Sequence, residues 1–395
     1  MTKQGLTILK SSSKIIKKKK EKTMIYNTFK DKKLSALGLG TMRFPKFSDK
    51  DSDIDIERTR EMIDYAIKNG INYFDTAYGY HSGQSEIVTG KLLSAYDRES
   101  YYLASKFPGY DLKNIKNKEA IFEEQLNKCG VDYFDFYLLH TITEDNAENY
   151  LSDEYGLIPY LLSEKKKGRI RHLGFSVHSG FDCFKDFLDR CGEHMEFCQV
   201  QLNYLDWTKQ NAKAKVELLN ERNIPVWVME PVRGGRLVNL SDEDTKLLRE
   251  MRDETNAAWA FRYLQTIPGV TVTLSGMSNM EQLQENIETF SENKPLSEKE
   301  MTALYDIAYR MTNEVPCTSC RYCVPYCPKG LDIPKIISTY NNNVFDKRDF
   351  KLSDDESLDA SRCIGCKACE KKCPQSIEIS TVMKTFTEKA GMIYK

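Results

Sequence analysis

The stretch FDTAYGYHSGQSE, residues Phe74–Glu86, decides how the rest of the chain is interpreted. It begins inside an apolar, β-rich run, Ile71–Asp75, which follows an Asn-Gly turn and is expected to be a buried strand. That strand ends at Asp75, and Tyr80 follows five residues later on a glycine-containing loop. The pattern predicts a polar site at the carboxyl end of a strand.

Two more predicted strands end in a polar residue, one at Lys106 and one at His140. In a parallel β/α barrel the carboxyl ends of the strands open onto one face, where catalytic side chains collect. Asp75, Tyr80, Lys106 and His140 are therefore expected to meet there. The alternative is a buried structural ion pair between Asp75 and Lys106, with His140 as a core histidine.

Strand and helix patterns alternate along the chain, which predicts a parallel sheet covered by helices. Eight such units in roughly 265 residues match the ~250 residues of a (β/α)8 TIM barrel. No GxGxxG motif follows any strand, which argues against a Rossmann domain. The predicted strands are Leu37–Gly40, Ile71–Asp75, Tyr101–Lys106, Phe134–His140, Ile170–Ser176, Phe197–Gln201, Pro225–Met229 and Val270–Leu274. The predicted barrel helices are Ile56–Lys68, Ser85–Tyr96, Lys118–Lys128, Gly156–Lys167, Gly180–Asp189, Asn211–Arg222, Asn256–Thr266 and Met280–Thr289.

From about Met24 to Glu300 the chain resembles the aldo-keto reductase family. Besides the Asp, Tyr, Lys and His set, the resemblance rests on GLGTM (Gly38–Met42), GFS (Gly174–Ser176), QVQLNY (Gln199–Tyr204) and SGMSNMEQLQEN (Ser275–Asn286). The resemblance implies hydride transfer from NAD(P)H to an aldehyde or ketone, or the reverse oxidation of an alcohol.

In that reaction Tyr80 would be the acid/base, because reduction of a carbonyl requires a proton on its oxygen. Lys106 is expected to lower the pKa of Tyr80, Asp75 to orient Lys106, and His140 to bind the carbonyl. Tyr78 lies three residues after Asp75, where the family pattern asks for five.

The resemblance also implies a nicotinamide cofactor, NADP(H) or NAD(H), on the same face. The expected contacts are Gly40, Thr41 and Met42 after the first strand, Ser176 and Gln199 at the carboxamide, Met229 beside the ring, Ser275, Gly276, Met277 and Ser278 at the phosphates, and Gln282, Glu285 and Asn286 at the adenosine. Asn279 stands where many NADPH-preferring relatives have Lys or Arg, so the choice of nucleotide stays open. Arg233 and Arg236 could bind phosphate instead, or be solvated loop charges.

Twelve cysteines include two runs with the ligand spacing of bacterial ferredoxins, each ending in Cys-Pro. In such runs the fourth cysteine ligates the other cluster, so two 4Fe–4S clusters are expected, one held by Cys317, Cys320, Cys323 and Cys373, the other by Cys363, Cys366, Cys369 and Cys327. Zinc is the alternative, because paired cysteines also bind it. The other four cysteines are expected to be core thiols.

The chain has 395 residues and a net charge of −1, so nothing requires nucleic acid as a partner. No apolar run reaches the ~18 residues that span a bilayer, and the cysteine clusters indicate a reducing, cytoplasmic location. We expect a barrel over residues 24–300 and a mainly α-helical ferredoxin-like domain over residues 301–395, with helices at Ile333–Tyr340 and Ser357–Ser361.

Residues 1–23 are rich in lysine and poor in apolar pattern, and we expect a disordered basic tail. One alternative is an arm for an anionic partner. A second is that Met24 is the natural start, because Lys20-Glu21 can be encoded by a ribosome-binding sequence at the usual distance from it.

Together these features are similar to ferredoxin-fused reductases of anaerobes. Three roles remain open: a carbonyl reductase acting on a small-molecule substrate, with clusters that are structural or dock a redox protein partner; a redox module that passes electrons between the clusters and a bound flavin or partner; and a nucleotide-sensing regulatory subunit. No flavin motif is present, and flavin is not excluded.

Overall fold

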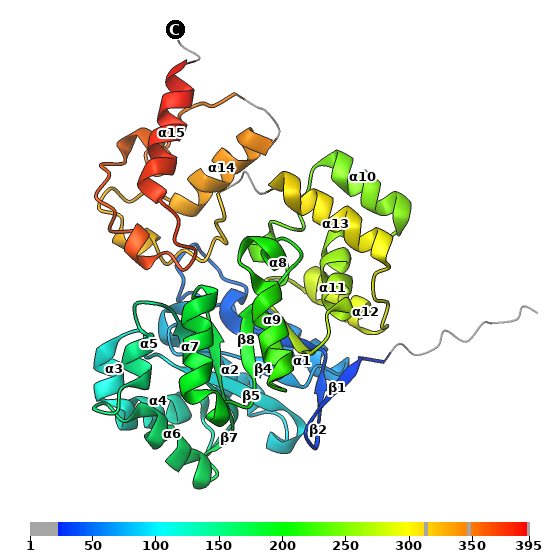
Figure 1. The fold of residues 1–395 in the computed structure, drawn as a ribbon, viewed down its shortest axis with the longest axis vertical. Coiled ribbons are helices and arrows are strands. Elements are labelled where there is room, and N and C mark those ends of the chain that lie inside the picture. The colour runs from blue at the N-terminus through cyan, green and yellow to red at the C-terminus, as the bar shows by residue number, and fades with distance from the viewer. Residues whose placement is uncertain (1–22, 312–314, 346–348, 393–395) are drawn as a thin grey trace, which may run out of the picture.

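The computed structural model describes residues 23–311, 315–345 and 349–392. Its central feature is a closed barrel of parallel strands in the order β10-β3-β4-β5-β6-β7-β8-β9 (Figure 1). The strands are β3 (Leu37–Gly40), β4 (Tyr73–Asp75), β5 (Tyr102–Phe107), β6 (Phe134–Ile142), β7 (Ile170–Val177), β8 (Cys198–Gln201), β9 (Val226–Met229) and β10 (Val270–Ser275). The predicted eight-stranded β/α barrel is confirmed.

Helices cover the outside of the barrel and bury their apolar side chains against the strands. Those that match the predicted ones are α1 (Ile56–Lys68), α2 (Gln84–Leu93), α4 (Lys118–Cys129), α6 (Leu157–Lys166), α7 (Phe181–Cys191), α9 (Ala212–Glu221), α11 (Asn256–Thr266) and α12 (Met280–Phe290). Capping fixes where several begin: the Asp55 carboxylate accepts from the backbone N–H of Arg58 at the start of α1. The helices α3 (Leu112–Lys116), α5 (Ala147–Leu151), α8 (Asp206–Lys209) and α10 (Asp242–Met251) lie in the connections and were not predicted.

An antiparallel hairpin, β1 (Tyr26–Phe29) and β2 (Lys32–Ser35), closes the amino end of the barrel. Its Phe29 is buried among the rings inside the barrel, 5.2 Å from Trp227 and 5.6 Å from Phe136 between ring centroids. The hairpin was not predicted. Because apolar packing fills this end, a polar site can form only at the opposite, carboxyl end of the strands.

The helix α13 (Glu298–Met311) crosses the boundary at residue 300 that the sequence suggested. Its Leu304 and Ile307 are fully buried in the same hydrophobic core as the barrel helices. Glu300 accepts from Arg252 at 2.8 Å, which ties the first turn of α13 to the barrel. We therefore propose that the barrel domain includes α13.

The cysteine-rich part follows α13 and has its own apolar core between α14 (Ile333–Phe345) and α15 (Ile379–Met392). The predicted helix at Ile333–Tyr340 lies within α14. The predicted helix at Ser357–Ser361 is wrong: this stretch is a turn followed by the start of a short 3-10 helix, Ala360–Arg362. The side chains of Asp355 and Asp359 accept from backbone N–H groups two residues on, which favours turns over a continuous helix.

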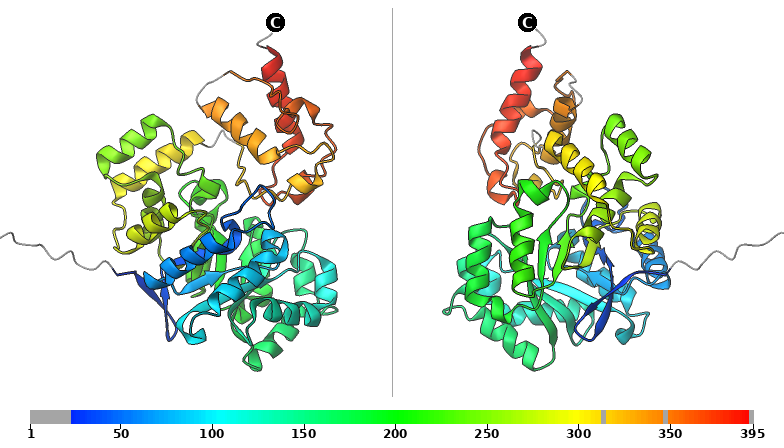
Figure 2. Two further views of the ribbon diagram at one scale, coloured as in Figure 1. Left: turned by 180° about the vertical axis from the view of Figure 1, so that it is seen from behind. Right: turned by 45° about the vertical axis from the view of Figure 1, so that its right-hand side comes forward.

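Figures 1 and 2 place the cysteine-rich part over one end of the barrel, and the β1–β2 hairpin at the other. Of the predicted tail, residues 1–23, all but Thr23 lies outside the described residues. Across the described part of the chain, no helix has the length and apolar character to cross a membrane.

Candidate active site

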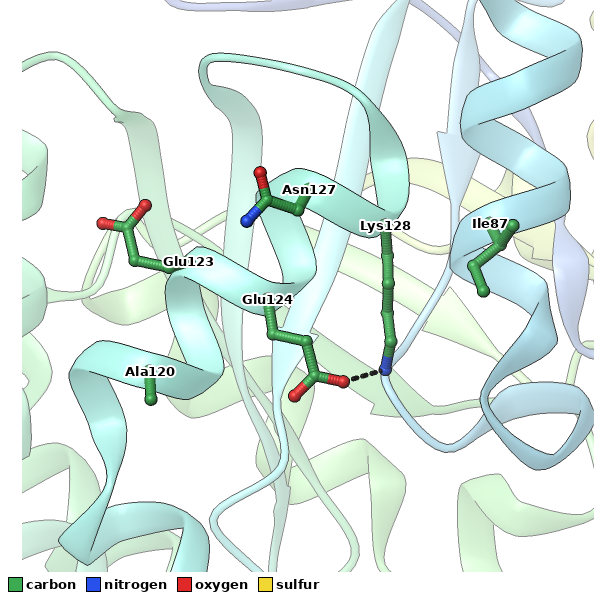
Figure 3. A pocket seen from close by; sticks show the side chains of 6 residues that line it. All are labelled: Ile87, Ala120, Glu123, Glu124, Asn127 and Lys128. Atoms are coloured by element: carbon green, nitrogen blue, oxygen red, sulfur yellow. Dashed lines mark ion pairs between the residues drawn. The ribbon is translucent and has the colours of Figure 1, made fainter.

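A cavity of about 440 Å³ opens at the carboxyl ends of the barrel strands, and Asp75, Tyr80 and His140 line it. A second hollow, about 670 Å³, lies on the surface between α2 and α4 (Figure 3). It is lined by Ile87, Ala120, Glu123, Glu124, Asn127 and Lys128. That hollow is wide open and contains none of the predicted site residues, so the barrel-end cavity is the candidate active site.

Asp75, Lys106 and Tyr80 come together at the base of this cavity. The Lys106 ammonium donates to Asp75 Oδ1 at 2.5 Å and to the Thr76 carbonyl oxygen at 2.8 Å, and its Nζ lies 3.4 Å from the Tyr80 hydroxyl. Lys106 is completely buried. The lysine is thus held by two acceptors with its third side toward Tyr80, an arrangement that can transfer a proton to a group bound in the cavity.

Burial dominates the protonation of this cluster. It raises the pKa of Asp75 and lowers that of Lys106, against their mutual attraction. The pKa of Tyr80 was expected to fall; instead burial, together with the nearby Asp75 and Glu230, raises it well above the usual value. Tyr80 therefore holds its proton at neutral pH, as a proton donor must.

His140 lies beside Tyr80, with their ring centroids 5.9 Å apart and the rings edge to face. Burial, Lys106 and His178 lower the pKa of His140 well below the usual value, so the imidazole is neutral. The Tyr150 hydroxyl donates to the His140 carbonyl oxygen at 2.6 Å and fixes the end of β6. A neutral imidazole in this position can hydrogen-bond a carbonyl oxygen without competing for its proton.

A buried polar network supports the lysine strand from the side away from the cavity. Glu86 accepts from Ser105 and from Gln125, each at 2.6 Å, and Gln125 also donates to the Lys106 carbonyl oxygen at 3.0 Å. Glu86, the last residue of the stretch Phe74–Glu86, was not predicted to have a role. Its network fixes β5 and hence the position of Lys106.

The expected nucleotide contacts line the same cavity for the most part. The expected contacts that line it are Gly40, Met42, Ser176, Gln199, Met229, Ser275, Gly276, Met277, Ser278, Gln282, Glu285 and Asn286. Gln199 is almost fully buried, and its Oε1 has no hydrogen-bond partner among the described residues. A carboxamide NH₂ group would satisfy it, so the residues present fit a nicotinamide.

Three residues that the sequence suggested as nucleotide or phosphate contacts do not line the cavity. The Thr41 hydroxyl pairs with the Ser85 hydroxyl at 2.6 Å, inside the protein. Arg233 is buried and its Nε donates to the Asp206 carboxylate at 3.1 Å. Arg236 donates to Asn342 of α14 at 3.0 Å and so joins the barrel to the cysteine-rich part.

The eight predicted cluster ligands form two groups. Cys317, Cys320, Cys323 and Cys373 form the first group, which we call the cavity-side group. Burial raises the pKa values of the first three thiols, and neighbouring thiols that include Cys373 raise them further. Cys327, Cys363, Cys366 and Cys369, the outer group, line a small separate cavity. In each group the fourth cysteine comes from the other run, and all-thiol donor sets suit iron–sulfur ligation.

No single-ion site is formed in the described part of the chain, where no three His, Cys, Asp or Glu side chains are close enough to share one metal ion.

The sequence profile of the Aldo/keto reductase family matches residues 36–308, about two thirds of the protein. The chain belongs to the aldo/keto reductase family. A profile for a 4Fe-4S dicluster domain matches residues 316–378, so this family member carries an iron–sulfur domain at its carboxyl end.

Curated relatives of this aldo/keto reductase are about a quarter identical to it over the aligned region. The NADH-specific methylglyoxal reductase of Escherichia coli is 26% identical over 70% of this chain and 95% of its own. The L-galactose dehydrogenase of Arabidopsis thaliana is 24% identical over 66% of this chain and 85% of its own.

Solved structures show the same fold. The holo form of the aldo-keto reductase AKR11C1 from Bacillus halodurans superposes with a TM-score of 0.59 at 26% identity, covering 72% of this chain and 96% of its own. An aldo/keto reductase from Klebsiella pneumoniae, in complex with NADP and acetate, has a TM-score of 0.56 at 21% identity over 73% and 95% of the two chains.

In this aldo/keto reductase the iron–sulfur domain contributes to the active-site wall. Thr318, Cys320, Tyr322, Pro374 and Gln375 line the same cavity as Tyr80. Glu230, which follows β9, also lines it. None of these except Cys320 was singled out in the sequence, because the contacts join segments that are distant along the chain and no local pattern marks them.

Proposed function

We propose that this chain is an NAD(P)H-dependent oxidoreductase that reduces a carbonyl group to an alcohol. The observation that supports this most directly is that Asp75, Tyr80 and the neutral His140 share one cavity with the unpartnered amide oxygen of Gln199. The buried Lys106 bonds Asp75 and Tyr80 from behind the cavity wall. A bound reduced nicotinamide supplies a hydride to the carbonyl carbon.

The side chains supply the rest of the reaction. The carbonyl oxygen accepts a hydrogen bond from His140 and the proton from the Tyr80 hydroxyl, so that an alcohol forms. The tyrosinate left behind is stabilised by the Lys106 ammonium, whose Nζ is 3.4 Å away. Asp75 keeps that ammonium charged and fixed, since an unpaired buried lysine would lose its proton.

We further propose that NADH is preferred over NADPH. Asn279 caps the first turn of α12 by accepting from the backbone N–H of Gln282, and Glu285 lines the cavity on the same helix. Arg43 is the only Lys or Arg side chain among the described residues that line the cavity, and its guanidinium donates to the Thr318 carbonyl oxygen. A 2′-phosphate would therefore meet a carboxylate instead of a cation.

The test is nucleotide consumption by the anaerobically purified protein, followed by absorbance with a panel of small aldehydes and ketones. The expected result is consumption that depends on the carbonyl and is faster with NADH at limiting concentration. A protein that binds nucleotide tightly but consumes none with any carbonyl would contradict the proposal.

Electron transfer is a second candidate, favoured by the position of Cys320 in the wall of the cavity that contains Tyr80. We infer that the proposed cavity-side cluster could exchange electrons with a flavin or other redox-active group bound there. An anaerobic absorbance spectrum with iron and flavin content, recorded before and after NADH, separates the two. Bleaching of the iron–sulfur absorbance by NADH supports electron transfer, whereas an unchanged spectrum during carbonyl reduction contradicts it.

A further inference from the structure

The outer group of cysteines reaches the surface of the protein. Cys327, Cys363, Cys366 and Cys369 line one small cavity, which is separate from the active-site cavity. Cys366 is exposed to solvent, and Ile364, two residues before it, is 60% exposed. A cluster bound by these thiols would therefore lie at the surface, within reach of another protein.

Two single turns join the outer group to the cavity-side group. A 3-10 turn separates Cys323 of the cavity-side group from Cys327 of the outer group. A second 3-10 turn separates Cys369 of the outer group from Cys373 of the cavity-side group. Each pair spans about 8 Å at the rise per residue of a 3-10 helix. The outer group is thus the surface end of a structure whose other end, at Cys320, lines the active-site cavity.

Exposed lysines surround the outer group. Lys329 and Lys367 line the same cavity as its thiols. Lys371 and Lys372 lie on the turn that follows Cys369. All four lysines are exposed, and within the described ranges the ammonium groups of Lys329, Lys367 and Lys371 form no ion pair. Their positive charge is therefore available to an acidic partner.

Glu370, the acidic residue that lies among these lysines in the sequence, is bonded to α15. Its Oε1 accepts from the Ser380 backbone N–H at 2.8 Å and from the Ser380 hydroxyl at 2.5 Å. Lys372 instead contacts the exposed ring of Tyr326, with its Nζ 5.1 Å from the ring centroid. We call the resulting combination of cations and apolar side chains the lysine surface; it consists of Tyr326, Lys329, Ile364, Lys367, Lys371 and Lys372.

We propose that the lysine surface docks a small acidic protein that carries one electron at a time. In each encounter the reduced carrier loses one electron to the cluster held by the outer group, and no bond or proton is transferred. Apolar contacts within a charged rim are the usual composition of a protein interface, and unpaired charges steer an oppositely charged partner to it. The exposed ligand Cys366 favours an electron carrier over other acidic partners.

This inference is independent of the proposed carbonyl reduction, because no residue of the lysine surface lines the active-site cavity. The test is binding of a purified plant-type [2Fe–2S] ferredoxin, a small acidic carrier, to the anaerobically purified holoprotein by surface plasmon resonance. We expect association to slow at least about tenfold between about 10 mM and about 150 mM salt, over which the Debye length falls from about 30 Å to about 8 Å. Cytochrome c, a basic carrier, should not bind.

Charge reversal gives the sharper test. The double variant Lys329→Glu/Lys367→Glu should associate with ferredoxin about tenfold more slowly or worse and should gain salt-dependent binding of cytochrome c. Lys371→Glu, which leaves the lining of the outer cavity intact, should change both in the same direction. Ile364→Ser should weaken ferredoxin binding at both salt concentrations, because an apolar contact is not screened. Lys246→Glu, on an exposed lysine of α10, is the matched control.

Iron content is measured in every variant, so that loss of a cluster is distinguished from loss of docking. Ferredoxin that fails to bind at low salt, or that binds equally at both salt concentrations, would overturn the proposal. A double variant with full iron content that binds ferredoxin like the wild type would overturn it too, since the lysines would then only balance the charge of the thiolates. Ferredoxin binding as expected, in protein that reduces no carbonyl with NADH, would contradict the proposed function alone.

Discussion

A Cβ atom on Gly234 would lie 2.1 Å from the carbonyl oxygen of Thr318, so the loop after β9 is in backbone contact with the cysteine segment, residues Cys317–Cys323. Gly234 also has φ +63°, a conformation that costs an L-residue about 1–2 kcal/mol. No side-chain rotation relieves this contact, because both partners are backbone.

Gly234→Ala should therefore displace the cysteine segment from the cavity. We expect at least a tenfold loss of kcat/KM for the carbonyl substrate, with NADH affinity unchanged, measured by steady-state kinetics and NADH fluorescence titration. Gly235→Ala is the matched control, because Gly235 has φ +91° but no atom nearer than 4.0 Å to an added Cβ. An equal loss in both variants would assign the effect to backbone strain and contradict the contact.

Tyr80→Phe should abolish carbonyl reduction by removing the proton donor, with a loss of about 10²–10⁴-fold in kcat, as for other general acids. NADH should still bind, which a fluorescence titration checks. Tyr78→Phe is the control: Tyr78 lies on the same loop, and its hydroxyl bonds Glu124 on α4 at 3.2 Å, away from the site. A Tyr80→Phe variant that keeps full activity would favour a regulatory subunit.

The two cysteine groups should lose metal separately. Cys373→Ser removes a thiol from the cavity-side group and Cys327→Ser one from the outer group, so each variant should keep about four of about eight iron atoms per chain. Iron analysis and electron paramagnetic resonance check this. Cys373→Ser should also weaken carbonyl binding more than Cys327→Ser, because only the cavity-side group lies in the active-site wall. The opposite order would contradict the exchange of fourth ligands.

Acid should destabilise the protein through His178. Burial, with Lys215 nearby, lowers its pKa to about 4 from the 6.5 of a free histidine. Between these values the unfolded chain binds a proton that the folded protein does not, so stability is full above pH 6.5 and falls as the pH drops to about 4. His178→Asn should make this loss smaller in thermal unfolding curves, the rest coming from His140, whose pKa burial also lowers, whereas His194→Asn, on the turn after α7, should leave it unchanged. A wild-type slope in His178→Asn would contradict the assignment.

Sequence alone predicted the barrel because each strand is a short apolar run that ends at a turn or a polar residue. It also predicted that Asp75, Tyr80, Lys106 and His140 share one face, since the strand ends of a parallel barrel are neighbours. The β1–β2 hairpin was missed because its strands, YNTF and KKLS, are mostly polar and show little apolar pattern.

The outer wall of the site could not be predicted. Tyr322 and Glu230 line the same cavity although they lie more than ninety residues apart in the chain, and no spacing rule links them. Arg233 was a candidate phosphate ligand because it lies in a glycine-rich loop. It is bonded instead to Asp206, and the two residues come together because β8 and β9, which precede them, are neighbours in the barrel.

The docking of the cysteine segment through Arg43 and Gly234 has a consequence for how the site is assembled. Because barrel and wall are parts of one chain, the wall meets the barrel at an effective concentration set by the tether, and dilution cannot separate them. A separately encoded iron–sulfur protein would need high affinity for the same rim to reach that occupancy. If the chain were cleaved between residues 311 and 315, assembly of the wall onto the barrel would become a bimolecular reaction. The activity would then depend on protein concentration.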